Sequence, residues 1–131
     1  MRILALDHGE VRTGVAISDE TATLARPLTT VAKADTAPGF AALLSLLEAE
    51  APELVVVGLP VSLDGREHEQ ARRARSFAER LKAAVDLPVE LYDERFTSRM
   101  ADQRGGRASR DARAAATLLE YYLRTIGEPT S

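Results

Sequence analysis

The sequence predicts an α/β fold in which five strands form one mixed sheet, in the element order βββαβαβα, with helices on both faces. Three short β-rich runs follow one another in the first 33 residues. Amphipathic helical stretches then alternate with apolar runs, and strands joined in this way add to a sheet in parallel, through right-handed crossovers. The length of 131 residues suits one domain. We therefore expect a single domain over residues 1–131.

The first three strands are predicted from apolar and β-branched residues. Residues 2–7 (RILALD) form a short apolar run that suits a buried strand, and residues 14–19 are near enough to pair with it as a hairpin. Residues 22–33 form the third run. Pro27 lies within it and cannot donate a backbone hydrogen bond. This proline therefore predicts an edge strand or a bulge.

The second half of the chain changes period. Asp35 or Thr36 can cap a helix that has Pro38 in its first turn. The apolar residues 54–57 predict a strand that is covered on both faces. The remaining elements are a helix over about 66–84, a strand over 88–92, and a helix from Asp111 to Ile126 that ends at Gly127. Charges of both signs in the helix over 66–84 indicate a solvated face with i, i+4 pairs.

Composition limits the class of protein. The chain contains no cysteine, which excludes disulfides and thiolate metal sites. It has no apolar run of about 20 residues and does not open with a signal peptide, so we expect a cytoplasmic protein. The net charge of −3 argues weakly against nucleic acid as a partner. The segment from position 95 to 113, however, contains six arginines and only two aspartates. This segment either contacts phosphates or is a solvated loop.

Three acidic residues are placed where strands and a helix could bring them together. Asp7 ends the first strand and Glu94 ends the last one. Chemistry in an open α/β sheet gathers at the carboxyl ends of its parallel strands. If these two strands are central neighbours, both carboxylates emerge at one edge. Asp111 begins the final helix, on the stripe of Ala115 and Leu118 that must face the sheet.

Each acid also has a purely structural interpretation. Asp7 could be a turn residue, Asp111 could interact with the helix dipole, and Glu94 could pair with Arg95. A cluster of the three acids would be electrostatically unfavourable, because the carboxylates would repel one another. Mg²⁺ or Mn²⁺ would offset this repulsion, since both prefer hard oxygen ligands. Two such ions can activate a water and stabilise the leaving oxygen during phosphodiester cleavage.

Four motifs resemble the YqgF family, also called RuvX, nearly end to end. The opening LDHGEVRTGVAISD resembles the acidic, glycine-containing hairpin of the family. The other three are VVVGLPVSLDG (55–65), YDERFTS (92–98) and DARAAATLLEYYL (111–123). Their order and spacing fit the family. Its members are regarded as nucleases that mature the 5′ end of pre-16S ribosomal RNA, or as Holliday junction resolvases.

The resemblance implies a ribonuclease H-like fold, whose element order matches the one predicted above. It also implies a bacterial cytoplasmic nuclease that depends on Mg²⁺ or Mn²⁺, with two ions expected, and that acts on nucleic acid. By position, Asp7, Glu94 and Asp111 would be the catalytic, metal-binding acids. His8 stands at a position that the family fills variously. It could shuttle a proton or be a turn residue.

Arginines near these acids are the candidates for contacts with nucleic acid. Arg12 could contact a phosphate, or form a structural pair with Asp19 or Asp93. The candidates for backbone contacts in the arginine-rich segment are Arg95, Arg99, Arg104, Arg107 and Arg110. Gly9 and Gly14 are expected to satisfy the backbone demands of the turn between the first two strands.

Other functions remain open at this stage. Phosphotransferases of the actin and sugar-kinase superfamily share this topology, but they need two such domains and the chain supplies one. A non-catalytic module that binds nucleic acid would have the same fold. Within the nuclease interpretation, a junction resolvase should be a symmetric dimer. A ribosomal RNA processor could be a monomer or work with a ribosomal particle, and the acidic net charge favours it.

Overall fold

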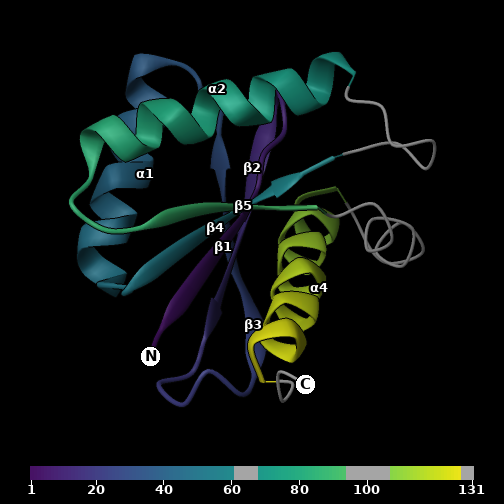
Figure 1. The fold of residues 1–131 in the computed structure, drawn as a ribbon. Coiled ribbons are helices and arrows are strands. Elements are labelled where there is room, and N and C mark those ends of the chain that lie inside the picture. Colours follow the sequence, from purple (N-terminus) through teal and green to yellow (C-terminus); the bar gives the residue numbers. More distant parts are fainter. Residues whose placement is uncertain (61–67, 94–106, 128–131) are drawn as a thin grey trace.

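A computed structural model describes residues 1–60, 68–93 and 107–127, with side chains from 111 to 126 in the last segment. Its centre is a five-stranded sheet in the order β3-β2-β1-β4-β5 (Figure 1). The strands are β1 (Ile3–Asp7), β2 (Arg12–Ser18), β3 (Ala25–Ala32), β4 (Leu54–Leu59) and β5 (Val89–Asp93). β1, β4 and β5 are parallel, while β2 is antiparallel to both of its neighbours. The predicted mixed sheet is therefore confirmed.

Helices cover both faces of the sheet, also as predicted (Figure 1). α1 (Ala37–Glu50) and α2 (Glu69–Ala84) lie on one face, and α4 (Arg107–Gly127) lies on the other. Alternate residues of β1 serve the two cores: Leu4 and Leu6 pack under α1 and α2, while Ile3 and Ala5 pack under α4. This alternation, which follows from the pleat of a strand, decides which side each residue of the site faces.

The signals at the start of α1 work as expected. The Thr36 hydroxyl accepts a hydrogen bond from the Gly39 amide at 3.2 Å, and Pro38 lies in the first turn. β3 is an edge strand, and its register against β2 shifts next to Pro27. Both structural consequences predicted for this proline are therefore present.

Two helix boundaries differ from the prediction. α4 begins at Arg107, four residues before Asp111. The sequence RASR at 107–110 lacks an apolar stripe but contains good helix formers, so helical propensity extends the helix beyond its apolar pattern. Asp111 is consequently in the second turn of α4. α2 begins at Glu69, after His68, rather than near residue 66.

In the part of the chain that the structure describes, no helix combines the length and the apolar character needed to cross a membrane.

Candidate active site

The carboxyl ends of the three parallel strands lie along one edge of the sheet. Leu6 of β1 pairs with Val57 of β4, which pairs with Leu91 of β5. Asp7, the last residue of β1, is therefore close to level with Asp93 at the end of β5. Its place in the alternation of β1 puts the half-buried Asp7 side chain on the α4 face of the sheet.

β1 and β5 are not central neighbours, which corrects one condition of the prediction. β4 lies between them, and β5 is an edge strand. Two interstrand spacings separate the backbones of β1 and β5 by about 10 Å. Asp93 is the last described residue of β5, and the predicted acid Glu94 lies outside the described residues. Its meeting with Asp7 stays a prediction.

Gly14 brings α4 close to the end of β1. It pairs with Asp7 across the antiparallel ladder between β1 and β2. A Cβ atom at this position would lie 2.0 Å from the backbone oxygen of Asp111, so only glycine permits this approach. Gly14 is therefore a strand residue that admits the helix, and not the turn residue that was predicted. Gly9 does lie in the turn, where a Cβ would meet the backbone oxygen of Arg12 at 2.3 Å.

Asp7 and Asp111 thus lie on one side of the sheet, linked through Gly14. Asp111 is on the stripe of Ala115 and Leu118, as predicted, and its side chain is 32% exposed. The helix points this carboxylate toward the sheet, but the side chain stays partly exposed to water.

Arg12 forms an ion pair with Asp111. Its Nε donates to Oδ2 at 3.2 Å, and its side chain is 29% exposed. The expected alternative partner Asp19 lies beyond the other end of β2. Asp19 accepts from the Thr21 hydroxyl and the amides of Thr23 and Leu24, which hold its pKa at about 2.

The two described acids provide donors that suit a hard divalent cation. Asp7 and Asp111 offer carboxylate oxygens on partly exposed side chains, so water could complete the coordination shell. The guanidinium beside Asp111 shows that this edge already stabilises a positive charge. Within residues 1–60, 68–93 and 111–126, no group of three or more histidine, aspartate or glutamate side chains could hold a metal. A third ligand from the described residues is therefore not assigned.

The arginine-rich segment is only partly described. Arg95, Arg99 and Arg104 lie outside the described residues. Arg107 and Arg110 belong to the first turn of α4, so their backbone is placed beside the site while their side chains are not described.

His8 faces the side of the sheet opposite to Asp7. Its side chain is 2% exposed, and Nε2 lies 2.9 and 3.0 Å from the two carboxylate oxygens of Asp35. Its ring stacks on Phe77 of α2 with centroids 4.6 Å apart. The His8 side chain therefore points away from the Asp7 carboxylate and toward α2.

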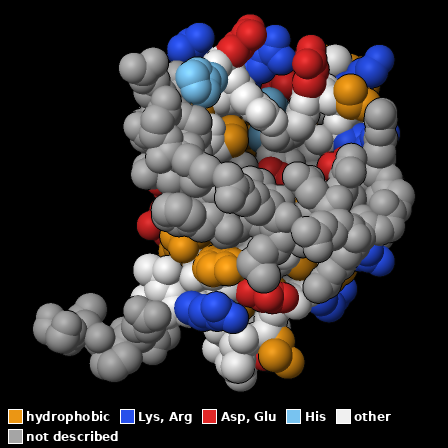
Figure 2. Space-filling view, turned by 90° about the vertical axis from the view of Figure 1, so that its right-hand side faces the viewer, with side chains coloured by type: hydrophobic (Ala, Val, Ile, Leu, Met, Phe, Trp, Pro, Cys, Tyr) orange, Lys and Arg blue, Asp and Glu red, His pale blue; other side chains and the backbone are white. Residues whose placement is uncertain are grey.

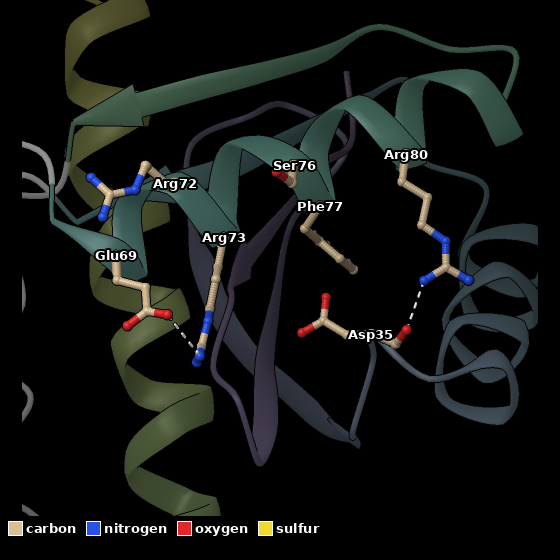
Figure 3. Close-up of a pocket in the computed structure, with 7 residues that line it drawn as sticks. All are labelled: Asp35, Glu69, Arg72, Arg73, Ser76, Phe77 and Arg80. Carbon is tan, nitrogen blue, oxygen red and sulfur yellow. Dashed lines mark hydrogen bonds and ion pairs between the residues drawn. The ribbon is translucent and has the colours of Figure 1, made fainter.

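The charges on α2 are mixed, as predicted. Arg73 pairs with Glu69 at 3.2 Å and Lys82 with Glu79 at 3.5 Å. Figure 2, which views the molecule from the right-hand side of Figure 1, shows basic and acidic side chains next to one another at the top, where α2 lies. The sequence pattern did not reveal that some of these side chains also line a cleft with Asp35 and Phe77 (Figure 3).

Comparisons with known proteins identify the family of the chain. A family model described as "RuvX: Holliday junction resolvase" matches residues 1–125. A protein of Anaeromyxobacter dehalogenans named "Putative pre-16S rRNA nuclease" is 42% identical, over 94% of this chain and 96% of its own length. A protein of the same name from Bordetella pertussis is also 42% identical, over 97% of this chain and 96% of its own.

Solved structures match the fold at lower identity. Thermus thermophilus RuvC has a TM-score of 0.59 at 18% identity and covers 96% of both chains. The Fowlpox virus resolvase, solved with Holliday junction DNA, has a TM-score of 0.52 at 10% identity and covers 98% of this chain and all of its own. These neighbours have the ribonuclease H-like fold, which confirms the predicted fold class. The family match over residues 1–125 and the 42% identity of full-length relatives show that the chain belongs to the RuvX (YqgF) family.

Proposed function

We propose that this protein is a divalent-metal-dependent nuclease that hydrolyses phosphodiester bonds while the 5′ end of pre-16S ribosomal RNA is matured. The observation that carries the proposal is the placement of Asp7 and Asp111 on one side of the sheet, at the carboxyl ends of its parallel strands. The names of the relatives support the RNA substrate. Residues 1–131 would act as one nuclease domain in the cytoplasm.

Asp7, Glu94 and Asp111 would hold Mg²⁺ or Mn²⁺. When bound, such ions supply an activated water and stabilise the leaving oxygen. Arg12 stabilises the Asp111 carboxylate in the metal-free protein through its 3.2 Å pair. Its guanidinium, beside Asp111, would also contact the phosphate at which cleavage occurs.

Arg95, Arg99, Arg104, Arg107 and Arg110 would contact the nucleic-acid backbone. Contacts with phosphates position a strand without reading its sequence. The net charge of −3 disfavours tight binding to free duplex, so delivery on a ribosomal particle is consistent with the composition.

Cleavage of four-way DNA junctions is the second candidate, because the family model itself is described as a Holliday junction resolvase. It requires two active sites in a symmetric dimer that makes paired cuts. The two candidates share the carboxylate site and differ in substrate and oligomeric state.

One experiment tests the site and the substrate together. Wild type, Asp7→Asn and the exposed control Asp86→Asn would be incubated with Mn²⁺ or Mg²⁺ and either a precursor RNA spanning the 5′ end of 16S or a four-way DNA junction. We expect RNA trimming by wild type and Asp86→Asn, and a loss of at least about 100-fold in Asp7→Asn. Paired symmetric nicks in the junction alone would favour the resolvase.

Calorimetric titration of Mn²⁺ without nucleic acid gives an independent readout. Asp7→Asn and Asp111→Asn should each weaken binding, whereas Asp86→Asn should not. If wild type binds no metal and cuts neither substrate, the catalytic proposal is wrong and a non-catalytic nucleic-acid-binding module is favoured.

A further inference from the structure

A cleft lies beside α2, on the face of the sheet opposite to Asp7 and Asp111. It consists of a cavity of about 410 Å³ between α2 and the turn before α1, and a cavity of about 290 Å³ beside the turn between β1 and β2. Glu69 and Arg73 line both cavities and join them. We call this the α2 cleft. Figure 3 shows that Phe77 and Asp35 point toward each other in it, between Arg73 and Arg80.

Hydrogen bonds hold both the carboxylate and the backbone of Asp35 in this cleft. The buried His8 contacts both of its oxygens through Nε2, at 2.9 and 3.0 Å. Arg80 donates to the Asp35 backbone oxygen at 2.8 Å, and its guanidinium lies 3.9 Å above the ring of Phe40. The Asp35 side chain is nevertheless 50% exposed. Because His8 occupies the edge between the two oxygens, their outer lone pairs remain available to a donor in the cleft.

Arg73 provides a positive charge next to this acceptor. It pairs with Glu10 at 3.1 Å and with Glu69 at 3.2 Å, and all three side chains are well exposed. Exposed ion pairs of this kind contribute little to stability, so Arg73 can exchange its carboxylate partners for a phosphate at small cost. Ser76 adds a hydroxyl group to the same wall. The cleft therefore offers a cation for a phosphate and a fixed acceptor for an N–H group.

The α2 cleft is connected to the candidate active site by the turn between β1 and β2. Asp7 is followed directly by His8, whose side chain lies under the cleft, and then by Glu10, which pairs with Arg73. A strand held at the carboxylates could cross this short turn and reach Arg73. The two sites are on opposite faces of the sheet but meet at the same edge.

We propose that the α2 cleft binds one unpaired nucleotide of the substrate, with its phosphate on Arg73 and the amino group of its base donating to Asp35. The base must be unpaired because paired bases in RNA do not present this edge to side chains. Cytosine, adenine and guanine carry such an amino group, whereas uracil offers the carboxylate only its ring N3–H. The inference rests on the proposed function only in taking nucleic acid as the substrate.

Cytosine and uracil make the sharpest probes, because they differ at the position where one has an amino group and the other an oxygen. Fluorescence anisotropy would measure binding of labelled decacytidylate and decauridylate to wild type, Asp35→Asn, Arg73→Gln and the exposed control Arg26→Gln on β3. EDTA would be present, so that binding is measured without cleavage. Circular dichroism and thermal unfolding would verify that each variant is folded.

Wild type should bind decacytidylate at least about fivefold more tightly than decauridylate, since a hydrogen bond to a charged acceptor discriminates to this extent. Asp35→Asn should abolish this ratio, because its amide both donates and accepts. Arg73→Gln should weaken both RNAs equally and reduce the salt dependence, and Arg26→Gln should match wild type.

A ratio near one in wild type, a ratio that persists in Asp35→Asn, or no binding of either RNA would each overturn the proposal. A purely structural role for the pair of His8 and Asp35 predicts lower thermal stability in Asp35→Asn with an unchanged ratio. The result is separable from the nuclease proposal, because Asp7→Asn tests cleavage whereas the binding assay contains no metal. A wild type that shows no preference for decacytidylate would therefore overturn the proposal for the α2 cleft without affecting the proposal that Asp7 and Asp111 bind metal.

Discussion

Two consecutive residues, the last of β1 and the first of the turn that follows it, point to opposite faces of the sheet. Asp7 points toward α4, where the close approach of two backbones places the partly exposed ion pair between Arg12 and Asp111. His8 points toward α2, where it is buried and holds a half-exposed Asp35. Both faces therefore present a carboxylate to solvent, each held by a cationic or histidine partner.

The way each carboxylate is held differs between the faces. On the α4 face, the position of Asp111 depends on the absence of a side chain at Gly14. On the α2 face, Asp35 is held by hydrogen bonds from His8 and Arg80. Because α4 contacts the backbone at Gly14, a single methyl group added there would displace Asp111. The side-chain contacts of the second face can be removed one at a time, with smaller consequences.

The largest effect is expected from Gly14→Ala. The added Cβ would lie 2.0 Å from the Asp111 oxygen, so α4 must move away from β2. Overpacking of this kind should lower the free energy of unfolding by about 2–3 kcal/mol and weaken Mn²⁺ binding, because Asp111 moves with the helix. Urea denaturation and calorimetry would measure both effects. Ala32→Ser, at an exposed position of β3, serves as the control and should change neither. Unchanged Mn²⁺ affinity in a destabilised Gly14→Ala would separate Asp111 from the metal site.

The sequence predicts these two faces to different extents. The spacing of apolar residues and the helix caps predicted every described element. Burial of residues such as Leu6 or Leu118 leaves an apolar pattern that is visible within a single segment of the sequence. The apolar spacing also placed Asp111 on the inner stripe of its helix. The start of α4 was predicted too late, because residues 107–110 are helical without contributing to the apolar stripe.

Contacts between distant segments could not be predicted in this way. The pairs of Arg12 with Asp111 and of His8 with Asp35 join residues 99 and 27 positions apart. Arginines and carboxylates are numerous in this chain, and nothing local selects one partner over another. The interposition of β4 between β1 and β5 likewise follows from strand order, which sequence periodicity does not contain.

A second prediction concerns pH and the α4 face alone. Burial and a 2.6 Å hydrogen bond to Glu90 raise the pKa of Tyr122 to about 12, from an ordinary value near 10. The resulting stabilisation is complete below pH 10 and is lost as the pH rises from 10 to 12, because the unfolded chain releases this proton first. Wild type should lose up to about 2 kcal/mol over this interval from Tyr122.

Tyr122→Phe should lose less stability than wild type between pH 10 and 12, as measured by denaturation at each pH. Tyr121→Phe is the matched control on the same helix, and its pH dependence should follow wild type. If Tyr122→Phe and wild type show the same loss, the hydrogen bond to Glu90 does not couple α4 to β5 through this proton.

The smallest effect on stability is expected from Arg12→Gln. Whether this substitution raises or lowers the affinity for Mn²⁺ is the more informative result. The pair with Asp111 is about 30% exposed on both sides, so its loss should cost less than about 1 kcal/mol of unfolding free energy. Arg12 and a divalent cation compete for the Asp111 carboxylate. Removing the guanidinium should therefore raise Mn²⁺ affinity by roughly fivefold, equivalent to about 1 kcal/mol.

Arg12→Lys, which keeps the charge, should bind Mn²⁺ as wild type does, and Arg26→Gln controls for the loss of a positive charge elsewhere on the surface. Cleavage by Arg12→Gln should fall despite tighter metal binding if Arg12 also contacts the phosphate. Weaker Mn²⁺ binding in Arg12→Gln would instead mean that the arginine orients Asp111 for the metal rather than competing with it. The α4 face would then resemble the α2 face, where His8 holds the carboxylate of Asp35 in place.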